Sequence, residues 1–170
     1  MMAKRLSFLA ALLLAAMAGH AGGQELAGCS AAAADEPPRT VYRCEGGLVI
    51  EAEAATELRA VAGAGGPQPA VVEVEGNAVL IEAGSGRGAF QILTPHAIAS
   101  VRGTVYAVEV SAGSTAVFVV EGLVGVSRRD GAEGVQLEAG EGVDVVPGEA
   151  LTVREWGQGR VDELLARFGR

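Results

Sequence analysis

The sequence has very little lysine, histidine, cysteine or aromatic side chain, and these shortages limit its chemistry. Among the 170 residues, Lys4 is the only lysine, His20 and His96 are the only histidines, and Cys29 and Cys44 are the only cysteines. Aromatic residues account for 4% of the chain, so the core must be built from Val, Leu, Ile and Ala. A lysine-based mechanism past the first few residues is excluded, and a histidine-based metal site lacks ligands.

The first 21 residues have the pattern of an export signal. A basic start, MMAKR, precedes an apolar stretch of 14 residues, and small residues follow at Gly19 and Ala21. This layout is typical of a cleavable signal peptide. No later stretch approaches the ~18 apolar residues that a spanning helix needs. We therefore expect a signal peptide at 1–21 and a periplasmic or secreted protein without a membrane span.

The charge balance argues against nucleic acid as a partner. The chain carries a net charge of −8, and loss of Lys4 and Arg5 with the signal peptide would lower it to −10. Such a surface repels phosphate backbones.

The two cysteines favour a disulfide in an oxidising compartment. A bridge between Cys29 and Cys44 would close a loop of about 15 residues, worth roughly 3 kcal/mol by chain entropy. The alternative is a lipid anchor on Cys29, since Leu26–Cys29 resembles a lipobox. A lipobox normally follows the apolar region directly, whereas here Glu25 precedes it. Residues 22–39 are expected to form an extended lead-in to the domain.

Most of the chain from residue 40 onward predicts short β-strands. Runs of alternating apolar and polar residues are separated by turn signals every 8–12 residues, a spacing typical of all-β proteins. Residues 40–44 and 48–54 flank the turn Glu45–Gly47 and predict a hairpin. We expect one all-β domain over 40–170, a short-stranded β-solenoid-like roll or sandwich.

One short helix is expected at the C-terminus, over about 160–168. Val161, Leu164, Leu165 and Phe168 fall on one face at helical spacing. Gly169 would end the helix. We expect this helix to cap an open end or an exposed edge of the β domain.

The stretch 94–110, TPHAIASVRGTVYAVEV, changes its alternation at Gly103. Before Gly103 the inward-facing side chain falls on an odd-numbered residue, Val101. After Gly103 the inward-facing side chains fall on even-numbered residues, Tyr106 and Val108. A β-bulge at Gly103 would reconcile them, since glycine tolerates the unusual dihedrals. Arg102 would then bond nearby carbonyls or an acidic neighbour. A ligand-binding role for Arg102 is the alternative.

Four short motifs in order resemble the FecR domain, with a match over about 71–153. They are Thr94-Pro95, then Arg102-Gly103-Thr104 with Tyr106, then Glu121-Gly122, and finally Leu137 with Gly140-Glu141. The resemblance implies an exported all-β module that binds protein or envelope components and takes part in signal sensing. In full-length regulators of this kind a cytoplasmic segment and a membrane span precede the domain and a signalling domain follows it, whereas this chain starts with an expected signal peptide.

The sequence offers few residues suited to catalysis, so we expect a non-catalytic module without cofactor or metal. His96 follows a proline and has no second histidine for a metal site, and no nucleophile-elbow pattern surrounds Ser100. The alternative function is a carboxylate-based envelope enzyme acting on carbohydrate, using Glu109, Glu121 or Glu141. Such an enzyme needs two carboxylates facing each other at a suitable separation.

Overall fold

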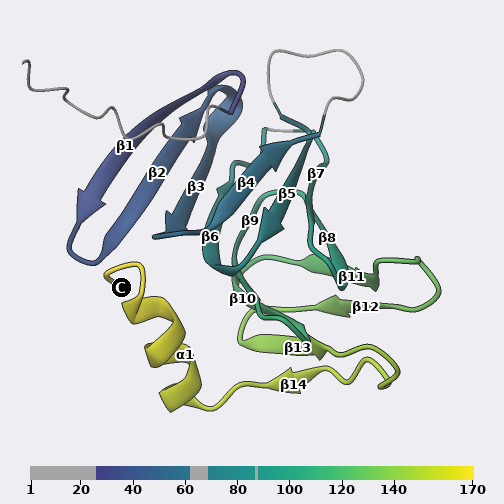
Figure 1. The fold of residues 1–170 in the computed structure, drawn as a ribbon. Helices are drawn as coiled ribbons and strands as arrows, with labels where there is room; N and C mark the ends of the chain where they lie inside the picture. Colours follow the sequence, from purple (N-terminus) through teal and green to yellow (C-terminus); the bar gives the residue numbers. More distant parts are fainter. Residues whose placement is uncertain (1–25, 62–68, 87) are drawn as a thin grey trace, which may run out of the picture.

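The structure, a computed structural model, describes residues 26–61, 69–86 and 88–170. The expected signal peptide at 1–21 lies outside these residues. Within them the protein is almost entirely β, with two stacked sheets and one helix (Figure 1). Among the described residues no helix is long and apolar enough to cross a membrane.

Two sheets hold all the strands of the described chain. The first sheet has the order β1-β2-β3-β6-β9-β10-β13-β14, and the second has the order β12-β11-β8-β7-β5-β4. The strands of the first sheet are β1 Cys29–Asp35, β2 Pro38–Cys44, β3 Leu48–Glu53, β6 Asn77–Ala83, β9 Thr104–Val110, β10 Thr115–Glu121, β13 Glu141–Val145 and β14 Arg154–Glu155. Those of the second are β4 Glu57–Ala60, β5 Val71–Glu75, β7 Phe90–Leu93, β8 Ala97–Val101, β11 Val124–Arg128 and β12 Gly134–Leu137.

The chain passes back and forth between the two sheets as it advances along both of them. It lays down one to three strands in one sheet, crosses to the other, and returns. The core lies between the sheets, where Ile50, Val79 and Tyr106 of the first meet Val74 and Ile92 of the second, all essentially unexposed. Because Val, Ile and Leu dominate this interior, few aromatic residues are needed to fill it.

The all-β prediction is confirmed, but the solenoid is not. All strand pairs of the described chain are antiparallel except β5 with β7, and the sheets are open at their edges. The predicted hairpin is present, with β2 and β3 joined by a single 3₁₀ turn at Glu45–Gly47. Turns recur at short intervals in this sequence because the chain crosses between the sheets as well as forming hairpins. The resulting spacing is similar to that of a solenoid.

The expected lead-in is part of the sheet. Residues Cys29–Asp35 form β1, which pairs with β2 over its whole length from Cys29 opposite Cys44 to Asp35 opposite Pro38. Cys29 and Cys44 form the predicted disulfide, so the sulfur that a lipid anchor would require is already bonded. The alanines of β1 carry no alternating pattern, so their strand could not be recognised from hydropathy.

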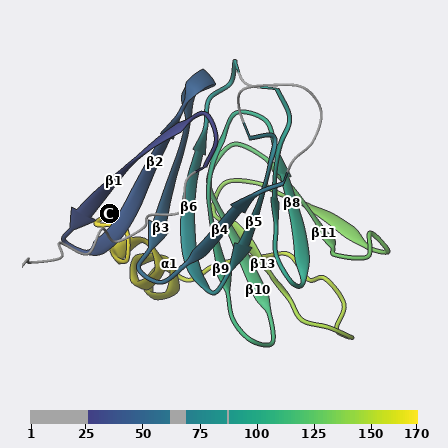
Figure 2. The same ribbon diagram turned by 45° about the horizontal axis from the view of Figure 1, so that its top comes forward.

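The helix α1, Gln158–Ala166, covers a face of the first sheet and not an edge or an open end. Leu164 and Phe168 are buried in a second, smaller core against Ala78, Leu80 and Phe118 of that face. The predicted apolar stripe is therefore correct, while its expected place in the fold is wrong. The turned view in Figure 2 shows α1 behind the strands of the first sheet, on the side away from β4 and β5.

Candidate functional site

The three glycines of the predicted motifs, and Gly84 outside them, lie where the chain changes sheets. Gly84 follows β6, Gly103 joins β8 to β9, Gly122 joins β10 to β11, and Gly140 joins β12 to β13. Because β9 pairs antiparallel with both β6 and β10, these corners lie at the same end of the two sheets. We call this end, defined by Gly84, Gly103, Gly122 and Gly140, the glycine end.

The corners at Gly103 and Gly122 pack directly against each other. Gly122 has φ 91°, and a Cβ there would stand 2.9 Å from the carbonyl oxygen of Gly103. The buried Thr104 hydroxyl donates a hydrogen bond to the carbonyl of Leu123 at 3.0 Å. The Arg-Gly-Thr motif and the Glu-Gly motif are therefore in direct contact, and each lies where the chain crosses from one sheet to the other.

No β-bulge exists at Gly103, contrary to the expectation. Val101 ends β8 in the second sheet and Thr104 begins β9 in the first, so the parity change reflects a change of sheet. The irregularity lies in the neighbouring strand instead, where the β9–β10 register shifts between Val119 and Glu121. Such a shift leaves one extra residue and re-aims its side chain.

Arg102 is exposed at this corner. Among the described residues its guanidinium has no hydrogen bond or ion pair, so the expected carbonyl or acidic neighbour is not found. Next to the other corner, Val120 is 38% exposed and Leu123 is 49% exposed. The glycine end therefore presents an unpaired cation and two apolar side chains to solvent.

A shallow hollow of about 310 Å³ adjoins these corners. The residues that line it include Gly47, Gly84 and Gly103, together with Ser85, Thr104, Glu82 and Glu121. The Glu82 carboxylate already binds Arg170. Of the hydroxyl groups that line the hollow, that of Thr104 donates to the carbonyl of Leu123 and not to either carboxylate.

The other carboxylates considered for catalysis are engaged separately. Glu109 binds Arg167 on the outer face of the first sheet, and Glu141 accepts a hydrogen bond from the main-chain N–H of Glu138 at 2.8 Å. Leu137 is fully buried in the core beside the Gly140 corner. Among the described residues no group of three or more potential metal ligands comes together.

Thr94 and Pro95 lie at the opposite end of the sheets from the glycine end. The buried Thr94 hydroxyl accepts hydrogen bonds from the main-chain N–H groups of His96 and Ala97 and lies 2.8 Å from the Thr115 hydroxyl. His96 Nδ1 lies 3.1 Å from that same Thr115 hydroxyl. These contacts shape the turn before β8, so the motif residues divide between two ends of the fold. An open hollow of about 730 Å³ lies beside Pro95 and His96.

Tyr106 lies in the middle of the core, away from both ends. Its side chain is completely buried, and its hydroxyl has no hydrogen-bond partner among the described residues. Burial raises the pKa of this hydroxyl above its usual value, because a phenolate there would be poorly solvated.

Replacing Tyr106 by Phe is expected to stabilise the protein. The change removes a buried hydroxyl without a partner and leaves the ring, so the free energy of unfolding should rise by about 1 kcal/mol. Urea unfolding of the two proteins measures the difference. Tyr106→Ala is the control for the ring itself and should lower stability by ~3–5 kcal/mol. A loss of stability in Tyr106→Phe would mean that the hydroxyl is hydrogen-bonded.

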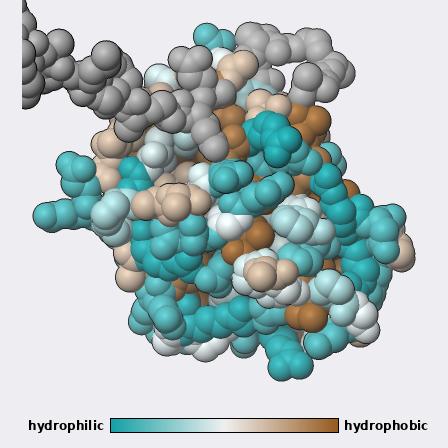
Figure 3. Space-filling model, in the orientation of Figure 1, coloured by the Kyte–Doolittle hydropathy of each residue, from teal (hydrophilic) through white to brown (hydrophobic). Residues whose placement is uncertain are grey.

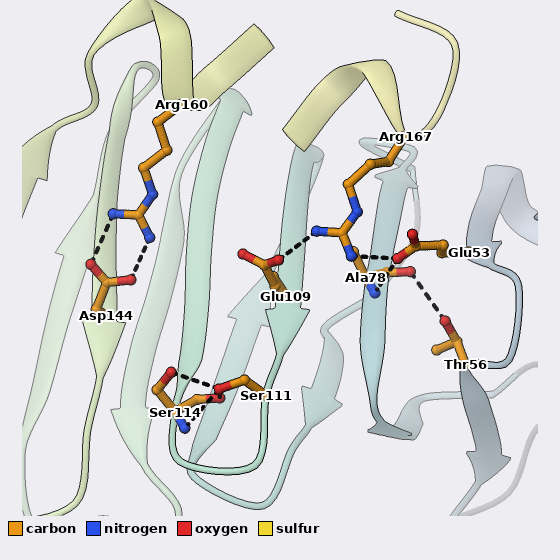
Figure 4. A network of polar contacts seen from close by, with 9 residues as sticks. All are labelled: Glu53, Thr56, Ala78, Glu109, Ser111, Ser114, Asp144, Arg160 and Arg167. Atoms are coloured by element: carbon orange, nitrogen blue, oxygen red, sulfur yellow. Dashed lines mark hydrogen bonds and ion pairs between the residues drawn. The ribbon is translucent and has the colours of Figure 1, made fainter. Parts of the chain in front are cut away.

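The sequence analysis missed a set of ion pairs between α1 and the outer face of the first sheet (Figure 4). Arg160 binds Asp144 of β13, with Nη1 donating to Oδ2 at 2.9 Å, and its guanidinium stacks over the Trp156 ring. Arg167 binds both Glu53 of β3 and Glu109 of β9, and its hydrogen bond with Glu53 raises the pKa of the guanidinium. The only signal in the sequence is that these acids alternate with core residues along their strands.

The visible face of the protein in Figure 3 is mainly hydrophilic, with apolar residues scattered over it. Large exposed apolar side chains are rare in the described part of the chain, where they are Val61, Val120 and Leu123. Two of these three lie at the glycine end.

One family model matches more than half of the chain. The family model described as FecR protein matches residues 36–125. This match begins and ends earlier than the expected 71–153, so it leaves out Leu137 and Gly140. No curated protein matches the chain.

Two solved structures share the fold. Both are crystal structures of a candidate anti-sigma factor from Parabacteroides distasonis ATCC 8503, each 19% identical to this chain. The TM-scores are 0.63 and 0.62, and the alignments cover 80% and 81% of this chain. The chain spans 64% of the length of either structure.

Proposed function

Because this chain belongs to the FecR protein family, we propose that it is a regulatory module that senses a signal by binding a protein or another envelope component. The fold it shares with a candidate anti-sigma factor supports a regulatory class. The proposed role is recognition and not catalysis, with the glycine end as the surface of contact.

The observation that carries this proposal is the pairing of Val120 and Leu123 with Arg102. An unpaired arginine beside exposed apolar side chains is a combination enriched in protein interfaces. The close main-chain packing beneath, where Gly122 touches Gly103, would limit the backbone ordering that binding requires.

We further propose that the protein works outside the cytoplasm. Residues 1–21 have the pattern of an export signal, and a disulfide such as Cys29–Cys44 persists mainly in oxidising compartments. The carbohydrate-enzyme alternative, with Glu109, Glu121 or Glu141, receives less support. Arg167 binds Glu109, a main-chain N–H binds Glu141, and Glu82, which shares the hollow with Glu121, is bound by Arg170.

Site-specific crosslinking tests the proposed surface. A photoreactive amino acid at position 123 should crosslink to one envelope protein in cells, while the same group at the exposed Ala132, at the other end of the fold, should not. Arg102→Ala should lower the yield at position 123 about tenfold. Its unfolding free energy should change by less than ~0.5 kcal/mol, because the side chain has no partner in the described structure.

Equal crosslinking at positions 123 and 132, or a yield at position 123 that is unaffected by Arg102→Ala and by Val120→Ala, would overturn the assignment of this surface.

A further inference from the structure

The strand β1 forms one edge of the first sheet and lacks the features by which proteins protect such edges. It is seven residues long, pairs with β2 without any shift in register, and contains neither proline nor lysine. Its central residues Ala31–Ala33 are exposed. A long, regular edge whose centre is uncharged is a template for another strand.

Main-chain groups of β1 point away from β2 at alternate residues. The N–H of Cys29 donates to the carbonyl of Leu26 and not to β2, and Pro38, opposite Asp35, has no N–H to offer. Both ends of β1 are therefore pairs without mutual hydrogen bonds. In an antiparallel pair of strands such residue pairs alternate with hydrogen-bonded ones, so Ala31 and Ala33 also make no hydrogen bond to β2. Their N–H and C=O groups face the open edge, and no bond to them is present within the described chain.

The described part of the chain leaves room for a docked strand. In both views β1 and β2 extend past the strands of the second sheet (Figures 1 and 2), so that sheet does not cover them. Alanine side chains are small, and they would allow large side chains of an added strand to lie beside them on either face.

Charged side chains near the two ends of β1 indicate which charges a partner strand would carry. Arg43, opposite Ser30, and Asp35 are exposed, and neither has an ion pair among the described residues. A second copy of the chain is disfavoured, because each copy carries a net charge of −8. An added antiparallel strand with a basic residue opposite Asp35 and an acidic residue opposite Ser30 would satisfy both charges. The arginine need only reach across Ser30 to a strand about 10 Å away.

We propose that the open edge of β1 is a docking site for an extended segment of a partner protein, added antiparallel, with a basic residue at its start and an acidic residue five positions further along. Four main-chain hydrogen bonds at Ala31 and Ala33 would hold it, and Asp35 and Arg43 would set its direction. This surface is separate from the glycine end and stands independently of the function proposed there.

A labelled peptide, Lys-Val-Thr-Val-Thr-Glu with blocked ends, serves as the probe. Hydrogen exchange at the amides of Ala31 and Ala33 should be fast in the free protein and at least about tenfold slower with peptide, while Ala32 and Ala34, bonded to β2, should not change. Fluorescence anisotropy should give an affinity that Ala33→Pro lowers about tenfold, since one N–H is lost from the edge. Proline there removes no bond within the fold.

Ala33→Val is the matched control, because it keeps the N–H and should bind within about twofold of the parent protein. Arg43→Glu should weaken this peptide and be rescued by a peptide that ends in Lys. The proposal is overturned if the peptide leaves Ala31 and Ala33 unprotected, or if Ala33→Pro binds as well as Ala33→Val. Protection that instead rises with protein concentration alone would make the occupant a second copy and overturn the partner assignment.

Discussion

Gly122→Ala is expected to lower the free energy of unfolding by about 3 kcal/mol or more. Two penalties add at this position. An alanine must adopt φ 91°, and a positive φ costs an L-residue ~1–2 kcal/mol. Its Cβ must also stand 2.9 Å from the Gly103 carbonyl and 3.2 Å from the Cα of Thr104, both of which are main-chain atoms that cannot rotate away.

Two other glycines separate these penalties. Gly131 has φ 72° with nothing within 4 Å of a Cβ, so Gly131→Ala should cost only ~1–2 kcal/mol. Gly113 has open space and no positive φ, so Gly113→Ala should change stability by less than ~0.5 kcal/mol. Urea unfolding of the three variants gives the ranking. A Gly122→Ala protein no less stable than Gly131→Ala would show that the two corners do not touch as described.

The same corner shows the limit of hydropathy patterns. Alternation along 94–110 correctly places Val101, Tyr106 and Val108 in the core. A bulge and a crossing between sheets both shift the alternation by one residue, so the pattern cannot distinguish them. The difference depends on which distant strands pair with β8 and β9, and that pairing is not encoded locally.

The disulfide and the apolar stripe of α1 could be predicted because each depends on a short spacing within the chain. The docking place of α1 could not. Arg167 binds Glu53, which lies 114 residues away, and this contact exists only because β3, β6 and β9 are neighbours in one sheet. In the sequence these acids have the appearance of solvated surface charges. The edge strand β1 was missed for a different reason, since a run of alanines has no hydrophobic alternation.

Phe168→Ala is expected to release α1 from the outer face of the first sheet. Phe168 is 1% exposed and packs in the smaller core with Leu164 and Phe118, and a buried Phe→Ala change costs ~3–5 kcal/mol. A helix of nine residues cannot hold its shape alone in water. The loss should therefore appear as local undocking of Gln158–Ala166, while the main core between the sheets remains folded.

Trp156, the only tryptophan of the chain, is a built-in probe of this step. Its ring stacks on Phe118 and lies under Arg160, so undocking should expose it and shift its emission to the red. Amides of α1 should lose protection from hydrogen exchange while those of β9 and β10 keep theirs. Glu163→Ala, on the exposed side of the same helix, should leave both signals unchanged. If Phe168→Ala keeps the parent emission and protection, the smaller core does not hold the helix, and the arginine pairs alone must be sufficient to dock it.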